Sequence, residues 1–363
     1  MQNIKNIIKN INLNVISTES LEIFNKNKSI FSSENSPNPM KIVGTHSGCF
    51  HADEVLAVVM IKYIPEFENM WVIRSRNKEI HNLTDILVDV GGLYDVEKKR
   101  FDHHMKEFNY VHDETSNIKM SAAGLVFKHY GLTFIKNILI NMDLFNEKID
   151  MQKIYNKLYL NFIAYVDGQD NGINQYNTEE KPRYSNNTSY GNRIARLNPE
   201  WCEPNADQSE RFKLALDVAE SELFDQIKFI AKVYLPCYNF VKESVEKRFE
   251  NHESGKILYF DFGLPWKSHL KTLEEEMNLK DNDILFAVVK NSEKDYRVST
   301  IGVCEGSFEF RKGIVKSWRG LEQNKLIELS RIEDIIFVHS SGFIGGAQTR
   351  ESAFRMAICS INE

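Results

Sequence analysis

Short apolar runs alternate with longer amphipathic stretches through the first half of the chain. Runs rich in Val and Ile predict buried strands at 41–46, 71–76 and 86–90. Stretches with apolar residues at helical spacing predict helices at 52–64, 121–130 and 155–166. Gly131 is expected to end the second of these helices. Strands that alternate with helices predict an α/β domain with a mainly parallel sheet.

A long helical stretch from Gln208 to about Phe249 follows a loop-like segment rich in Asn, Pro and Tyr. Its apolar residues recur every three or four positions, which is typical of a packed helix face, and Pro236 is expected to kink or break it. Further strand-like runs lie at 256–260, 284–289, 296–301 and 335–339, before a helix at about 349–360. They predict a second, smaller α/β domain, joined to the first by the long helix.

The first 40 residues differ in composition from the rest of the chain. They are rich in Asn, Ile, Lys and Ser, and no acidic residue precedes Glu19. We interpret them as a disordered extension or an amphipathic targeting segment, and the lack of Arg counts against the second interpretation. The expected organisation is an extension (1–40), a first domain (41–205), linking helices (206–254) and a second domain (255–363).

The numbers of acidic, basic and cysteine residues exclude some classes of protein. The 363 residues include 45 Lys and Arg against 51 Asp and Glu, a formal net charge of −6. This acidic balance argues against a purely electrostatic nucleic-acid binder but permits an enzyme that grips phosphate locally. No run approaches the roughly 18 apolar residues of a membrane span, so no membrane partner is expected. Five scattered cysteines without a CxxC pair predict reduced, mostly buried thiols in an intracellular protein.

Four clusters of acidic and histidine residues follow the predicted strands. They are His46 to Asp53, Asp89, Asp102-His103-His104 and Asp167 to Asp170. Each alone is explained by a helix end, a turn or a surface histidine. Together, at the strand ends of one sheet, the carboxylates would repel one another unless cations neutralised them. Imidazole mixed with carboxylate suits Mn²⁺, Fe²⁺ or Zn²⁺, and a carboxylate that bridges two ions is typical of two-metal hydrolases.

These motifs, in this order, resemble the DHH phosphoesterase superfamily. Its pattern is carried by His46-x4-His51-x-Asp53, Val88-Asp-Val-Gly-Gly92, Phe101-Asp-His-His104 and Val166-Asp-x-x-Asp-Asn-Gly172. More narrowly, the chain resembles the melanocyte-proliferating-gene-1 family, once called a metal-dependent protein hydrolase family. That resemblance rests on Pro182-Arg-Tyr184, Arg193-x-x-Arg-Leu-Asn-Pro-x-Trp201, Pro265-Trp-Lys267, Trp318-Arg-Gly-Leu321 and Phe337 to Glu351. It runs from about Lys41 to the C-terminus.

The resemblance implies a two-domain phosphoesterase with two Mn²⁺ or Mg²⁺ ions, and a 3'-5' RNA exonuclease of the nucleus or mitochondrion. The implied metal ligands are His46, His51, Asp53, Asp89, His103 and Asp167. Asp89 would bridge the ions and act in catalysis with His103 and His104, and His104 would also face the substrate phosphate. His51 departs from the superfamily, which commonly has Asp there. Asp167 is chosen over Asp170, although spacing alone does not separate them.

The segment from His339 to Gly346 is expected to form a strand, a glycine-rich loop and then a helix. The amides of Gly345 and Gly346 would then approach an anion at the helix N-terminus, and Arg350 would add a phosphate fork. His339 and Lys267 are further substrate-binding candidates.

Three function classes share these features. The leading expectation is a metal-dependent exonuclease on single-stranded RNA or short oligonucleotides. A small-phosphate hydrolase, such as a pyrophosphatase or nucleotide phosphatase, needs the same metal core, and a non-catalytic binding protein would keep the fold alone. A homo-oligomer and a cytoplasmic location are left open.

Overall fold

The computed structural model describes residues 13–31, 40–176, 180, 182, 184–304, 307, 309–321 and 323–363. The chain divides into two compact units, the first unit Met1–Ala231 and the second unit Lys232–Glu363. Each unit is built around its own sheet.

Six strands of the described residues form the sheet of the first unit. In spatial order they are β1 (Val15–Ser17), β3 (Met70–Arg74), β2 (Lys41–Thr45), β4 (Ile86–Val88), β6 (Arg100–Phe101) and β5 (Tyr94–Asp95). All neighbouring strands are parallel except β5 and β6. This confirms the predicted α/β class and brings the carboxyl ends of β2, β4 and β6 to one edge of the sheet.

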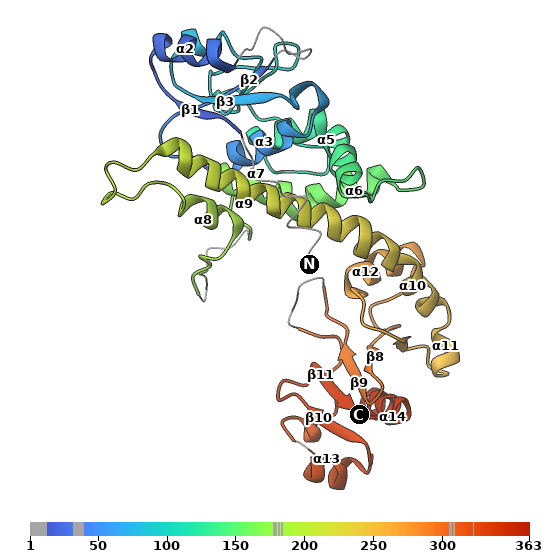
Figure 1. Ribbon diagram of the computed structural model, residues 1–363. Helices are drawn as coiled ribbons and strands as arrows, with labels where there is room; N and C mark the ends of the chain where they lie inside the picture. Colours follow the sequence, from blue (N-terminus) through green and yellow to red (C-terminus); the bar gives the residue numbers. More distant parts are fainter. Residues whose placement is uncertain are drawn as a thin grey trace. The chain divides into compact units, whose positions relative to one another are not determined.

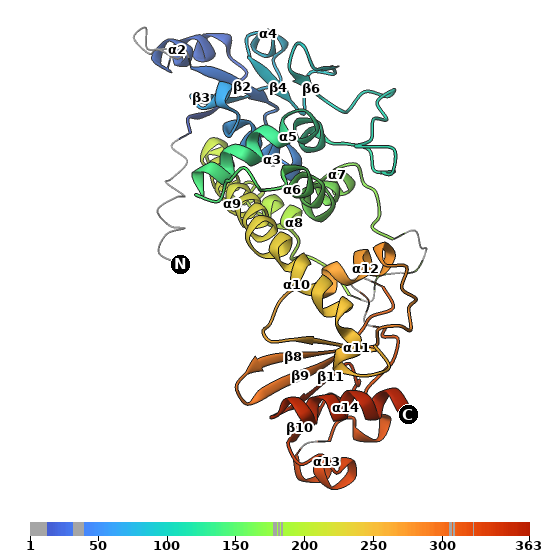
Figure 2. The same cartoon turned by 90° about the vertical axis from the view of Figure 1, so that its right-hand side faces the viewer.

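Helices cover both faces of this sheet (Figures 1 and 2). One face carries α2 (Leu21–Phe31) and α4 (Lys78–His81), and the other carries α3 (Ala52–Lys62), α5 (Ala122–Asn141) and α9 (Gln208–Phe229). Successive strand residues point to opposite faces, so Trp71 and Ile73 of β3 pack with Phe24 of α2. Burial of β3 on both faces explains its unbroken apolar run.

The expected extension at 1–40 is partly wrong. Residues 15–17 and 21–31 form β1 and α2, and β1 pairs with β3 in parallel, with Val15 opposite Val72. The strand is only three residues long and is stabilised by pairing with β3, a long-range contact that its Asn-rich composition conceals. Residues 1–12 and 32–39, which include most of the proposed targeting segment, lie outside the described residues.

Helix α5 continues through Gly131, where we predicted an end. A Cβ atom at Gly131 would lie 2.4 Å from the ring of Tyr155, so the glycine allows close packing against α6 (Met151–Leu158). Tertiary packing therefore overrides the helix-ending tendency of glycine here. The chain continues as a π-helical turn, η2 (Tyr159–Ile163), and then as α7 (Ala164–Asp170) and α8 (Tyr190–Ala195).

The long helix is interrupted near Pro236, as predicted. Helix α9 passes into a π-helical turn, η3 (Ile230–Tyr234), and α10 (Leu235–Glu246) begins with Pro236 in its first turn. A proline lacks the N–H that an uninterrupted α-helix needs at this position. The boundary between the two units falls within η3.

Five strands of the described residues form the sheet of the second unit. In order they are β10 (Ile335–Val338), β11 (Ile344–Ala347), β9 (Asp295–Thr300), β8 (Phe286–Ser292) and β7 (Ile257–Phe260). Only β7 and β8 are parallel among these pairs. Residues of α14 (Arg350–Asn362) join one core cluster, and residues of α10 and α12 (Lys267–Glu276) join another. Shorter helices are η1 (Pro65–Phe67), α11 (Arg248–Asn251), η4 (Lys316–Trp318) and α13 (Gln323–Ser330).

The cysteines are free thiols, but four of the five are exposed and only Cys237 is buried. The prediction of mostly buried thiols is therefore wrong. Across the described residues, no helix combines the length and apolarity that a membrane crossing requires.

Candidate metal centre

Three segments that follow strands, and the end of one helix, meet at the carboxyl edge of the sheet of the first unit. The loop after β2 carries His46, and Asp89 directly follows β4. The segment after β6 carries His103, and the end of α7 carries Asp170. Parallel strands place such loops together, so residues far apart in the sequence form one cluster, in which histidine and carboxylate atoms approach within hydrogen-bonding distance.

Asp89 lies between two imidazole rings. Its Oδ2 atom is 3.3 Å from Nε2 of His46, and its Oδ1 atom is 3.1 Å from Nε2 of His103. The backbone of Asp89 has a φ of 59°, a left-handed conformation that Asp tolerates better than most residues. The N–H group of Asp89 donates to the carbonyl of Phe101 at 3.0 Å, which holds this conformation.

Three groups of side chains in this cluster could hold a metal ion, each with its ligand atoms within 4.8 Å of one another. The groups are His46, His51, Glu54 and Asp89; Asp89, His103 and His104; and His51, Asp53 and Asp170. Asp89 and His51 each belong to two groups, so the cluster is continuous. We call these eight residues the metal cluster.

Asp53 is the carboxylate of the metal cluster whose charge is least compensated by its neighbours. It is fully buried, and among the described residues no N–H or hydroxyl group donates to its carboxylate oxygens, although the carboxyl group of Asp170 lies close enough to share a proton with it. Burial, together with the charges of Asp89, Asp170 and Glu54, raises the pKa of Asp53. Buried carboxylates are costly unless a cation or hydrogen bonds compensate them. Nitrogen and oxygen donors gathered around such a carboxylate fit a divalent metal ion.

The contacts between carboxylates and imidazoles in the cluster also change the pKa values of His46 and Asp89. Burial would lower the pKa of His46, but Asp89 and Glu54 raise it to about 10. Burial opposes ionisation of Asp89, but its contacts with His103 and His46 outweigh burial and lower its pKa. Without a metal ion, a proton on His46 thus compensates part of the carboxylate charge.

The loop that carries His46 and His51, which we call the His46 loop (46–51), is held by residues from several elements. Asn198 pairs with Phe50, accepting from its N–H and donating to its carbonyl at 2.8 Å each. Buried Arg74, at the end of β3, donates to the carbonyl of Gly48 at 2.6 Å. The carboxylate of Glu54 accepts from the N–H of His51 at 2.8 and 2.9 Å. The ligand positions are therefore fixed by the surrounding fold.

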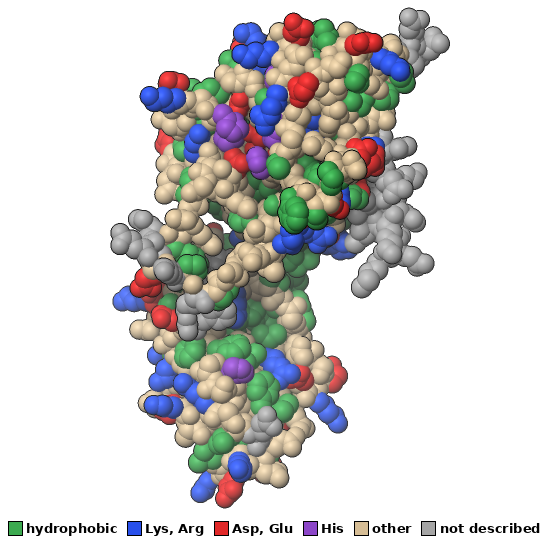
Figure 3. Space-filling view, turned by 90° about the vertical axis from the view of Figure 1, so that its left-hand side faces the viewer, with side chains coloured by type: hydrophobic (Ala, Val, Ile, Leu, Met, Phe, Trp, Pro, Cys, Tyr) green, Lys and Arg blue, Asp and Glu red, His purple; other side chains and the backbone are tan. Residues whose placement is uncertain are grey.

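Asp102 organises the segment after β6. Its carboxylate accepts from the backbone N–H groups of Gly92, His103 and His104 at 2.6 to 3.1 Å. It also lies 2.7 Å from Nδ1 of His104, so this nitrogen donates to Asp102 and Nε2 remains available. The side chain of His104 is 63% exposed, whereas that of His103 is 4% exposed. Histidine side chains reach the surface beside acidic and basic ones on one face of the molecule (Figure 3).

A family model described as an uncharacterised protein family, UPF0160, and named for the MYG1 exonuclease, matches residues 42–361. The chain belongs to the MYG1 family. It is 39% identical over 321 residues to the MYG1 protein of Dictyostelium discoideum, covering 88% of this chain and 96% of the relative. It is 37% identical to proteins called MYG1 exonuclease in Bos taurus and MYG1 protein YER156C in Saccharomyces cerevisiae. These alignments cover 87% and 88% of this chain and 83% and 96% of the relatives.

The structure of this MYG1-family chain corrects the choice of Asp167. Asp170, not Asp167, lies in the metal cluster, with its Oδ2 atom 3.1 Å from Nε2 of His103. Asp167 instead accepts three hydrogen bonds at the start of α5, from the N–H and hydroxyl of Ser121 and the N–H of Gly124. Both residues lie on one helical turn of α7, so sequence spacing could not separate them.

Glu54 is the residue of the metal cluster that the sequence analysis missed. Its Oε1 atom lies 3.0 Å from Nε2 of His46, and the side chain is fully buried. A Glu in the first turn of a helix is usually a capping residue, and Glu54 also fills that role. Its burial, which no local pattern reveals, is the signal that distinguishes it.

The substrate-binding candidates of the second unit are separated by the fold. Lys267 and His339 line a cavity of about 850 Å³ together with Phe343. The expected glycine-rich loop before the last helix is wrong for Gly345 and Gly346, which lie in strand β11 between β9 and β10. Their backbone groups therefore take part in strand pairing with β9 and β10.

The position of Arg350 also differs from the one expected for a residue that binds phosphate. Its guanidinium lies 4.1 Å from the ring centre of Tyr259 and 5.3 Å from that of Phe354. Arg350 does not line the cavity of the second unit.

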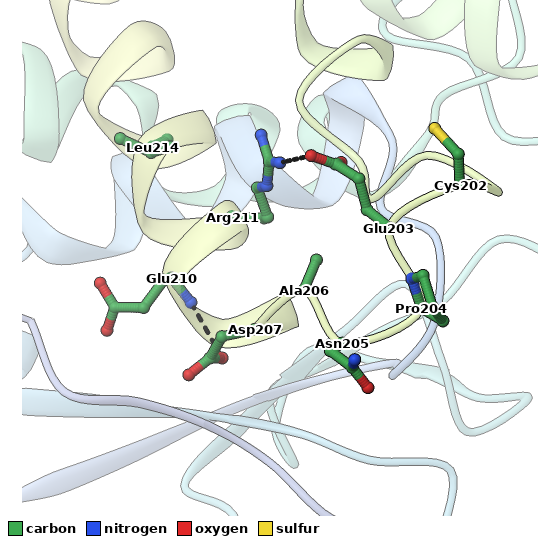
Figure 4. Close-up of a pocket in the computed structure, with 9 residues that line it drawn as sticks. All are labelled: Cys202, Glu203, Pro204, Asn205, Ala206, Asp207, Glu210, Arg211 and Leu214. Atoms are coloured by element: carbon green, nitrogen blue, oxygen red, sulfur yellow. Dashed lines mark hydrogen bonds and ion pairs between the residues drawn. The ribbon is translucent and has the colours of Figure 1, made fainter.

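A second hollow lies on the first unit, around residues 202–214 (Figure 4). Arg211 and Glu203 point toward each other there and form an ion pair at 2.6 Å, and Asp207 caps α9. These charges are already paired, and the hollow shares no residue with the metal cluster.

Proposed function

We propose that this chain is a divalent-metal-dependent phosphodiesterase that acts as a 3'-5' exonuclease on single-stranded RNA. The observation that carries the proposal is Asp89, whose two carboxylate oxygens face two different histidines, His46 and His103. A carboxylate in this position suits a bridge between two metal ions. The names of the Bos taurus and Homo sapiens relatives, MYG1 exonuclease, support the nuclease class.

The residues that would hold the ions are those of the metal cluster other than His104, with Asp170 in the place first given to Asp167. Mixed imidazole and carboxylate donors favour Mn²⁺ over Mg²⁺. When bound, such ions lower the pKa of coordinated water and neutralise charge on a phosphate. The chain contributes the buried carboxylates that concentrate the cations and the loops that keep the donors in place.

His104 is the residue of the cluster best placed to touch a substrate phosphate. The hydrogen bond to Asp102 raises the pKa of His104, which favours a charged ring at neutral pH. With Nδ1 held by Asp102, Nε2 can donate to a phosphate oxygen. The guanidinium of exposed Arg76, 3.4 Å from Nδ1 of His46, adds positive charge beside the cluster.

The cavity of the second unit supports a nucleotide-containing substrate. Phe343 and His339 lie with ring centres 4.8 Å apart, and Lys267 contributes a cationic side chain to the same cavity. An aromatic ring offers a stacking surface to a base, and an ammonium group attracts a phosphate. Pyrophosphate would use the cation but not the aromatic ring.

The deciding experiment incubates the purified chain and Mn²⁺ with 5'-labelled single-stranded RNA, the matching DNA, or pyrophosphate. A 3'-5' exonuclease shortens labelled RNA stepwise, whereas attack from the 5' end releases the label as a mononucleotide. Hydrolysis of pyrophosphate with intact RNA would refute the exonuclease proposal in favour of a small-phosphate hydrolase. Bound Mn²⁺ without hydrolysis of any substrate would indicate a binding protein.

Two variants test whether the metal cluster carries out the metal-stimulated hydrolysis. Asp89→Asn keeps the size of the side chain but removes its charge, so we expect loss of metal-stimulated hydrolysis with the fold retained. Asp225→Asn, on the exposed surface of α9, is the matched control and should retain full activity. Full activity of Asp89→Asn would refute the assignment of the cluster.

A further inference from the structure

The segment between β1 and α2 contacts the His46 loop and the end of β3, although it precedes the residues matched by the family model, 42–361. Glu19 lies in this turn. Its carboxylate accepts from the hydroxyl of Ser47 at 2.6 Å and from that of Ser75 at 2.9 Å. It also accepts from the N–H of Arg76 at 2.9 and 3.0 Å. One side chain thus ties the turn to the His46 loop and to the end of β3.

Ser47 and Arg76, two of the residues that Glu19 contacts, both lie next to the ring of His46. Nδ1 of His46 lies 3.1 Å from the carbonyl oxygen of Ser47, to which it donates. Nε of Arg76 donates to the same carbonyl at 3.3 Å. With Nδ1 donating to this carbonyl, Nε2 faces Glu54 and Asp89 and is the nitrogen that would bind a metal ion once its proton is displaced. Backbone carbonyls commonly orient metal-binding histidines in this way.

We infer that Glu19 is a positioning residue that holds the Ser47 carbonyl and thereby orients His46 toward the metal cluster. This inference rests on the proposed metal-binding function of that cluster. It assigns the β1–α2 segment, outside the family match, a part in shaping the metal centre. Hydrogen bonds from Ser47, Arg76 and Ser75 lower the pKa of Glu19 although burial opposes this, so the carboxylate stays ionised at neutral pH.

Removal of an outer partner of a metal-binding histidine typically weakens metal affinity by about 10- to 100-fold. Glu19 acts on His46 through Ser47, so we expect Glu19→Ala to weaken Mn²⁺ binding roughly 10-fold, at the lower end of that range. Glu19→Gln keeps an acceptor for Ser47 and should recover part of the affinity. Glu22→Ala, on the exposed side of α2, is the matched control and should leave it unchanged.

The experiment titrates Mn²⁺ into the 363-residue chain and the three variants by calorimetry, and also follows RNA hydrolysis at limiting and saturating Mn²⁺. A positioning role predicts that Glu19→Ala loses activity at limiting Mn²⁺ and regains it at saturation, with KM for RNA unchanged. A role in chain stability alone would instead lower the melting temperature of the metal-free protein without this rescue.

The outcomes separate this inference from the proposed function. If Glu19→Ala binds Mn²⁺ as tightly as the wild type, the positioning role is refuted, whatever the substrate. If wild type and variants differ in Mn²⁺ affinity as expected but no RNA is cleaved, the positioning role stands and the exonuclease proposal fails.

Discussion

Asp167 and Asp170 lie on one turn of α7 but should have different roles, which substitution can separate. Asp167 accepts hydrogen bonds from the start of α5, whereas Asp170 belongs to the metal cluster. Asp167→Ala removes the acceptor of three hydrogen bonds and leaves the buried N–H groups of Ser121 and Gly124 without a partner. Each such loss costs about 1–3 kcal/mol, so we expect a loss of about 2–4 kcal/mol in the free energy of unfolding. For a unit of this size, that corresponds to a fall of roughly 5–15 °C in the melting temperature.

Asp170→Asn should instead weaken Mn²⁺ binding without lowering the stability of the metal-free protein. The substitution removes a negative charge that faces Asp53 and Asp89, so the metal-free protein should be at least as stable as the wild type. Because a carboxylate is lost from the metal cluster, Mn²⁺ affinity should fall by at least about 10-fold, and hydrolysis of RNA should fall with it.

The assay compares thermal unfolding in chelator, followed by circular dichroism, with calorimetric Mn²⁺ titration of both variants. Asp225→Asn serves as the control for a change of charge on the same unit. Wild-type Mn²⁺ affinity in Asp170→Asn would refute its place in the metal cluster. Loss of Mn²⁺ affinity in Asp167→Ala at unchanged stability would restore the original choice of Asp167.

Four further outcomes are expected. Burial raises the pKa of Asp167 to about 7, above the value of about 3.9 in an unfolded chain, so the folded state binds the extra proton between these values. The wild type should therefore lose stability relative to Asp167→Asn as the pH rises from about 4 to 7, and a constant difference in urea unfolding would contradict this. His104→Gln should lower kcat roughly 100-fold with Mn²⁺ affinity nearly unchanged, and an equal loss in both would make it chiefly a metal ligand. Asn198→Ala removes both hydrogen bonds to Phe50 and should cost about 1–3 kcal/mol and weaken Mn²⁺ binding, which calorimetry would show. Lys267→Gln should raise KM for RNA without lowering kcat, and unchanged steady-state kinetics would exclude this side chain from substrate binding.

Strands β2, β3 and β4, and the acidic and histidine residues that follow β2 and β4, were predictable because they depend on local patterns, whereas β1, β5 and β6 were not predicted. Apolar runs mark β2, β3 and β4, and the residues after them must lie at one edge of a parallel sheet. Positions where packing competes with local preference were not predictable. Helix α5 continues through Gly131 because Tyr155 packs there, and Gly345 and Gly346 enter a strand because β9 and β10 lie on either side.

The sequence by itself determined the α/β class, the family and the kinds of donor groups at the candidate site, because motif composition and order survive without coordinates. Only the tertiary structure decided which of two neighbouring carboxylates joins the metal cluster and that Glu54 belongs to it. It also decided that residues before position 40 enter the sheet. Each of these outcomes depends on the direction and burial of a side chain. Those properties follow from contacts between distant segments, and spacing along the chain does not encode them.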